Sequence, residues 1–70
     1  MKIYHLEAII NNQEVLKKSF ISRKTADKYM EKILNRYNLE VDDIIYRDHK
    51  HSQEFVCNEY SRISIKRVQF

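Results

Sequence analysis

Hydrophobic and polar residues alternate over the first twenty positions, and a period of two is typical of β-strands. Within residues 2–10, the apolar positions that share one face are Tyr4, Leu6, Ala8 and Ile10. Within residues 14–21, Leu16 and Phe20 lie on one side. The pattern therefore predicts two consecutive strands, each with one face toward a core.

The turn between these strands carries Asn-Asn at residues 11–12. Asparagine tolerates the left-handed conformation that hairpin turns need when glycine is missing. A three-residue loop over 11–13 places Leu16 opposite Ala8, so that the apolar faces match. A two-residue loop instead places Lys17 opposite a core position. We predict the three-residue loop, because a slip of one residue inverts the faces of a strand.

At Ser22 the hydrophobic period changes to that of a helix, and a serine hydroxyl is well suited to accept a hydrogen bond from a first-turn amide. The apolar residues then form one stripe at helical spacing: Ala26, Tyr29, Met30, Ile33, Leu34 and Tyr37. Polar residues fill much of the opposite face: Lys24, Asp27, Lys28, Glu31, Lys32 and Asn35. Asn38 suits a left-handed helix end, with Leu39 folding back as its hydrophobic contact. We predict a helix from Arg23 to Tyr37.

The last thirty residues return to strand-forming sequence. The predicted segments are a strand at 44–46, a turn within 47–52, a strand at 55–57, a turn at 58–61 and a final strand over 63–70. In the final strand the apolar positions change face near Lys66 and Arg67, which predicts a β-bulge there. The order β-β-α-β-β-β predicts a single α+β domain over residues 1–70, a small antiparallel sheet with one helix packed on one face.

The composition removes several classes of chemistry, because the chain contains no glycine and no proline. Glycine-rich phosphate loops, dinucleotide-binding turns and G-x-S-x-G nucleophile elbows are therefore excluded. Residues with AT-rich codons (Ile, Lys, Asn, Tyr and Phe) make up 30 of the 70 positions. This bias is typical of an AT-rich genome, and we expect a low-GC bacterium or a phage or mobile element that lives in one.

Size and charge restrict the partners. A chain of 70 residues builds only a marginal core, which leaves a homodimer open as a source of stability. Cys57 is the only cysteine, so no internal disulfide can form and we expect a cytoplasmic location. No apolar run exceeds three residues, and we expect no membrane partner. The formal net charge of +3 permits an acidic partner without requiring one.

Three groups of residues deserve a test as chemical sites. His49 and His51 would point the same way on an extended strand and could share a metal, but the spacing matches no established motif. Cys57 with a histidine could form a nucleophile and base, yet a cysteine in an apolar strand is usually a small core residue. The carboxylates that follow the helix are more typical of a solvated loop: Glu40, Asp42 and Asp43. We therefore predict no catalytic residues, no metal, no cofactor and no enzymatic activity.

A basic sheet face is the first of two candidate binding features. Arg62 and Lys66 alternate with apolar residues of the last strand, so they would line the face away from the helix, and Lys17, Ser19 and His5 could extend that face. Cations and aromatics on an open sheet face are typical of single-strand nucleic-acid binding. Carboxylates interrupt this surface, however: Glu7, Glu54 and Glu59. Nucleic acid therefore remains the alternative partner.

Protein binding is the second feature, because short strands leave edges that can pair with another chain, and exposed tyrosines provide anchors. We expect a small non-enzymatic protein, encoded by a phage or mobile element, that inhibits or modulates a larger host enzyme such as a defence nuclease by occupying an acidic surface. The predicted partner-binding residues are Tyr46, Arg47, Lys50, Tyr60, Arg62, Lys66 and Arg67.

Overall fold

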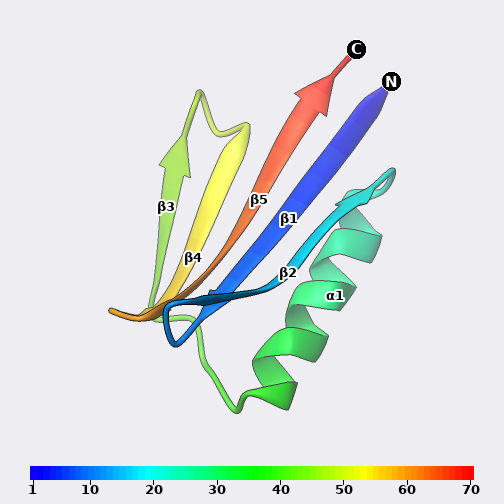
Figure 1. The fold of residues 1–70 in the computed structure, drawn as a ribbon. Coiled ribbons are helices and arrows are strands. Elements are labelled where there is room, and N and C mark those ends of the chain that lie inside the picture. Colours follow the sequence, from blue (N-terminus) through cyan, green and yellow to red (C-terminus); the bar gives the residue numbers. More distant parts are fainter.

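The computed structural model describes residues 1–70, which form one five-stranded antiparallel sheet and one helix in the order β-β-α-β-β-β (Figure 1). The elements are β1 (Lys2–Ile10), β2 (Gln13–Phe20), α1 (Arg23–Arg36), β3 (Asp43–Arg47), β4 (Ser52–Asn58) and β5 (Ser61–Gln69). The strand order across the sheet is β2-β1-β5-β4-β3, and the two termini lie side by side because β1 and β5 are neighbours. The predicted α+β fold is confirmed.

The β1–β2 hairpin has the predicted register but a different loop. Ala8 lies opposite Leu16 as expected, yet the turn contains only Asn11 and Asn12, whose φ angles are 53° and 64°. The predicted three-residue loop is therefore wrong. A bulge at Val15 supplies the extra residue, since the register shifts between Ala8 and Ile9. The bulge restores the apolar face that a two-residue turn alone would have inverted.

Helix α1 ends one residue earlier than predicted, at Arg36. Ser22 occupies the N-cap position, but its hydroxyl makes no capping hydrogen bond, so that part of the prediction is wrong. The C-terminal end is as expected: Asn38 has a φ of 53°, and the Leu39 amide donates to the Leu34 carbonyl at 2.8 Å. This is the pattern of a left-handed helix end, and it turns the chain toward β3.

The C-terminal half is a meander of β3, β4 and β5. The β3–β4 turn contains three consecutive residues with positive φ: Asp48, His49 and Lys50. The bulge predicted near Lys66 and Arg67 is wrong, because β5 pairs with β1 without any register shift there. The irregularity instead falls in β4, between Val56 and Asn58. Val68 therefore lies on the face away from the helix, opposite Ile3.

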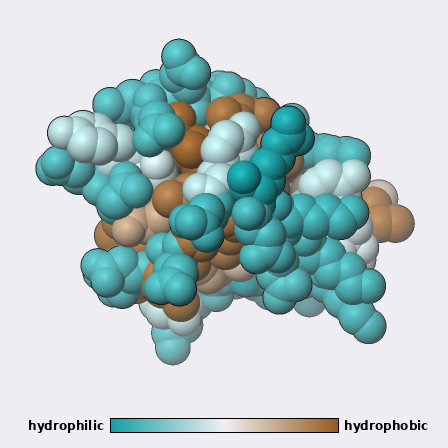
Figure 2. Space-filling model, turned by 90° about the horizontal axis from the view of Figure 1, so that it is seen from below, coloured by the Kyte–Doolittle hydropathy of each residue, from teal (hydrophilic) through white to brown (hydrophobic).

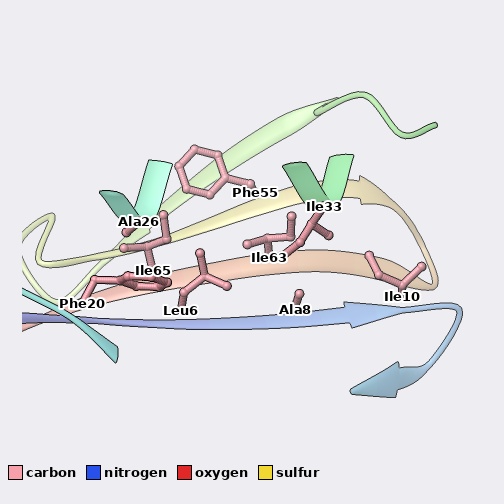
Figure 3. Close-up of a cluster of buried hydrophobic side chains, with 9 residues drawn as sticks. All are labelled: Leu6, Ala8, Ile10, Phe20, Ala26, Ile33, Phe55, Ile63 and Ile65. Carbon is pink, nitrogen blue, oxygen red and sulfur yellow. The ribbon is translucent and has the colours of Figure 1, made fainter. Parts of the chain in front are cut away.

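The core lies between α1 and the central strands, where side chains from both layers point toward one another (Figure 3). Its nine buried members are Leu6, Ala8, Ile10, Phe20, Ala26, Ile33, Phe55, Ile63 and Ile65. No side-chain polar atom is buried without a hydrogen-bond partner. The core is small, as expected for a chain of this length.

The helix covers only part of the sheet, because it packs on β1 and β2. At the opposite edge, Ile44 and Tyr46 of β3 lie on the helix side of the sheet but stay 40% and 53% exposed. α1 is also too short and too polar for a transmembrane segment.

Candidate binding surface

Helix α1 carries a row of exposed cations, which we call the cationic row: Lys24, Lys28, Lys32 and Arg36. Its members follow one another every four residues, a rise of about 6 Å per step along the helix axis. Each salt bridge in the structure uses an arginine outside the row, namely Arg23, Arg47 or Arg62. The charge of the cationic row is therefore not neutralised within the molecule.

The charge surplus of the whole protein resides on this helix. Over Arg23–Arg36 there are five cations and two carboxylates, a surplus of three. The formal net charge of the chain is also +3, so the cations and carboxylates of the remaining residues cancel. An anionic partner is consequently attracted to the α1 side of the molecule.

Lys18 extends this positive surface from the neighbouring strand β2. Its Nζ donates to the Tyr29 hydroxyl at 3.2 Å and lies 4.7 Å from the centre of the Tyr29 ring. Lys32 Nζ lies 5.2 Å from the same centre, so two ammonium groups flank one aromatic ring. The hydrogen bond and the positive charge of Lys18 lower the pKa of the Tyr29 phenol from its ordinary value.

An apolar hollow of ≈ 230 Å³ opens between β2 and the second half of α1. Its lining residues are Val15, Leu16, Tyr29, Lys32, Ile33, Arg36 and Tyr37. Val15 and Tyr37 are exposed at 38% and 39%, and two members of the cationic row stand at the rim. Figure 2 looks onto the end of the molecule where α1 ends and β2 begins, and hydrophobic atoms reach the surface there between hydrophilic ones.

The sheet face away from the helix is electrically balanced. The register places four cations on it: Lys17, Arg47, Arg62 and Lys66. It places four carboxylates there as well: Glu7, Glu14, Asp43 and Glu54. Glu54 contacts Arg47 at 3.5 Å and Arg62 at 3.3 Å, so this face offers less free positive charge than the sequence indicated.

The structure does not bring the seven predicted partner-binding residues into one patch. Arg47, Arg62 and Lys66 share the outer face of the sheet. Arg67 lies on the helix side, where its guanidinium contacts the His51 ring. Tyr46 is also on the helix side.

The two remaining predicted residues lie in turns at opposite ends of β4. Lys50 is in the β3–β4 turn, and Tyr60 is in the β4–β5 turn with 51% of its surface exposed. Both are accessible, and they stand at opposite ends of the strand. The role of each as a partner contact stays a prediction.

Sequence reasoning missed the cationic row and its hollow. The four-residue spacing of the cations was visible in the sequence, but basic residues on the polar side of an amphipathic helix usually mark only a solvated face. Nothing in the sequence indicated the hollow, because its lining includes Val15, which lies at a bulge that the sequence did not predict.

Of the residues considered for chemistry, the structure brings together Cys57 and the acidic loop but does not align the two histidines. Asp48 to Lys50 are not extended, so His49 and His51 lack the strand geometry that would align them. No group of three or more histidine, cysteine or acidic side chains is arranged to hold a metal ion. Burial raises the pKa of the Cys57 thiol, which disfavours the reactive thiolate. A second hollow of ≈ 420 Å³ joins Cys57 to the loop that carries Glu40 and Asp42.

Comparison with protein-family models, with curated proteins and with solved structures finds no match.

Proposed function

We propose that this chain is a non-enzymatic binding protein that occupies an acidic surface of a larger protein through the cationic row and the adjoining hollow. The observation that carries the proposal is the apolar hollow, with Lys32 and Arg36 at its rim. An apolar centre surrounded by charged groups is the usual anatomy of a protein–protein contact. The matching partner element is an apolar side chain set among carboxylates.

The hollow favours a protein over a nucleic acid. Phosphate groups use cations but have no use for an apolar pocket, whereas a leucine or phenylalanine anchor fills one. The aromatic ring closest to the cations, Tyr29, is already flanked by Lys18 and Lys32 and is not free to stack on a base. The balanced outer face of the sheet also gives little support to phosphate binding there.

The partner that the composition supports is a host enzyme, such as a defence nuclease. The AT-rich bias of the sequence fits a phage or mobile element, and the cationic row requires an acidic surface on such an enzyme, outside the basic region that holds nucleic acid. Binding of this protein inhibits or modulates such an enzyme by steric and electrostatic blockade. It requires no bond making by any residue of the chain.

The first experiment uses a pair of matched charge reversals. The test variant is Lys28→Glu with Lys32→Glu on α1, and the control is Lys17→Glu with Lys66→Glu on the outer sheet face. Fluorescence anisotropy is measured with a labelled acidic peptide that has a central leucine between glutamates. We expect the peptide to bind the wild type and the control, and the test variant to lose at least about tenfold in affinity.

Two further probes separate the possible binding modes. The same peptide with a central alanine should bind more weakly, because it leaves the hollow unfilled. A DNA duplex at low salt should bind no better than the alanine peptide. The proposal fails if the control double variant loses binding instead, or if duplex DNA binds tightly and loses affinity steeply with salt, which would establish the nucleic-acid alternative.

A further inference from the structure

The sheet has two edge strands, and only one is protected against pairing with another chain. On the β2 edge, Lys17 and Lys18 are adjacent and Val15 forms a bulge, and both features oppose strand addition. On the β3 edge, five residues pair with β4 without any register shift and include no lysine. β3 is therefore the edge that can accept another strand.

The sequence of β3 is complementary to itself in the antiparallel direction. If two copies pair about Ile45, Asp43 of each copy lies opposite Arg47 of the other, so opposite charges meet at both ends. Ile44 then lies opposite Tyr46 of the second copy, and these side chains are 40% and 53% exposed in the single chain. Each charged residue of the strand thus lies opposite an opposite charge, and each apolar or aromatic residue lies opposite another such residue.

The two ends of the strand region differ in charge. Exposed carboxylates of Glu40, Asp42 and Asp43 lie at the start of β3, whereas Arg47 ends the strand and is followed by Asp48 and Lys50, whose charges cancel. An antiparallel arrangement brings the acidic end of each copy to the basic end of the other. A parallel arrangement would instead place like charges together.

The backbone at this edge is free to pair. The Ile44 amide donates to Oδ1 of Asp43 at 2.9 Å rather than to a neighbouring strand. Because amides along a strand alternate between its two sides, the Tyr46 amide faces the same open edge. A second strand would provide carbonyl acceptors for both amides and would release the Asp43 carboxylate to meet Arg47 of the other copy.

We propose that the protein forms a two-fold symmetric homodimer by antiparallel pairing of β3 with β3 of a second copy, which joins the two sheets into one. The helix does not obstruct this contact, because α1 packs on β1 and β2 at the far side of the sheet (Figure 1). The cationic row stays exposed in both copies, so the dimer is independent of the proposed partner surface.

The expected dimer is weak, since the contact is a short strand and a few side chains. We expect a dissociation constant on the order of 10 µM, at the low end of specific interfaces. Sedimentation equilibrium over about 1 µM to about 1 mM protein should therefore show a change from monomer to dimer. Added salt should shift the change to higher concentration, because both end contacts are ionic.

The decisive experiment reverses the charge of Asp43 or of Arg47 in separate variants and then mixes the two variants. Asp43→Arg alone and Arg47→Asp alone each bring like charges together in a homodimer, and each should weaken dimerisation by at least about tenfold. An equimolar mixture of the two variants places opposite charges at both ends again and should form a heterodimer. Restoration in the mixture also shows that each variant is folded. Glu14→Arg, in strand β2 at the opposite edge of the sheet, is the matched control and should dimerise like the wild type.

Two results overturn the proposal. If the wild type stays monomeric up to about 1 mM, the β3 edge does not pair with itself, and a strand of a different protein becomes its remaining occupant. If the dimer forms but neither single reversal weakens it, the copies associate through another surface.

Discussion

At the scale of single residues, Tyr29 shows how the positive surface acts on a side chain. Its hydroxyl accepts a hydrogen bond from Lys18, the centre of its ring lies 4.8 Å from the centre of the Phe20 ring, and Lys32 Nζ lies over the same Tyr29 ring. A phenolate is stabilised by both ammonium groups, so the pKa of Tyr29 lies below its ordinary value. The same lysines that would attract a partner therefore lower the pKa of Tyr29 in the free protein.

The lowered pKa of Tyr29 can be tested by titration. Because the folded pKa of Tyr29 is lowered, the associated stabilisation is absent below the folded pKa, grows as pH rises through it, and is complete above the unfolded value of about 10. Ultraviolet absorbance should show one of the five tyrosines ionising before the others. Lys18→Met should remove this early component, while Lys66→Met should not. A single common transition in all three proteins would contradict the assignment.

Cys57 illustrates the opposite environment. It occupies the irregular position of β4 and is partly buried, and the resulting desolvation raises the pKa of its thiol. In a regular strand, only one of the neighbours Val56 and Cys57 would point inward. The bulge leaves both residues half-buried, which strand alternation alone could not have predicted.

At the scale of elements, the absence of glycine is compensated in the turns. Six residues have positive φ, and asparagine or aspartate supplies four of them: Asn11, Asn12, Asn38 and Asp48. These residues tolerate the left-handed region better than others. Histidine is also enriched in this region, but lysine is not, so Lys50 is the least favourable residue of the β3–β4 turn.

Lys50→Gly should therefore stabilise the protein. Lys50 has a φ of 69°, where a side chain costs energy and glycine does not. We expect the free energy of unfolding in urea to rise by about 0.5–1 kcal/mol, and the melting temperature by a few degrees. The control is Lys66→Gly in the regular strand β5, which should destabilise by a similar amount. Equal losses in both variants would mean that the turn is not held in the left-handed region.

The elements themselves could largely be predicted from the sequence, because hydrophobic period and helix-end signals act locally. The prediction that Leu16 lies opposite Ala8 is confirmed, and the matching of apolar faces was the right reason for it. The predicted longer loop, however, was wrong, because a bulge produces the same register. A bulge and a longer loop satisfy the same pattern, and only the backbone geometry distinguishes them. Ser22 likewise had the right identity for a cap, but its hydroxyl is not used.

At the scale of the whole molecule, the important property is the separation of two surfaces. The charge surplus and the apolar hollow lie on the α1 and β2 side, and the free strand edge lies at β3. This separation follows from the strand order β2-β1-β5-β4-β3, which places the two edge strands as far apart as the sheet allows.

The candidate site was harder to predict than the fold, because it also depends on the order of the strands in the sheet. Arg62 and Lys66 were placed correctly on the outer face, but which carboxylates meet them depends on pairing between strands distant in sequence. Glu54 reaches both Arg47 and Arg62 only because β4 lies between β3 and β5. The pairing of strands that are distant in sequence decides which cations lack a carboxylate partner. The hydrophobic pattern of the sequence does not predict that pairing.

The partner-surface proposal requires that α1 packs on β1 and β2, and the dimer proposal requires that β3 stays a free edge. Amide hydrogen exchange, followed by NMR in dilute solution where the protein is monomeric, tests this most directly. The account predicts the slowest exchange in β1 and β5, protection of Ile45 by β4, and rapid exchange of the Ile44 and Tyr46 amides at the open edge. Slow exchange of Ile44 and Tyr46 in the monomer, or rapid exchange throughout β5, would contradict it.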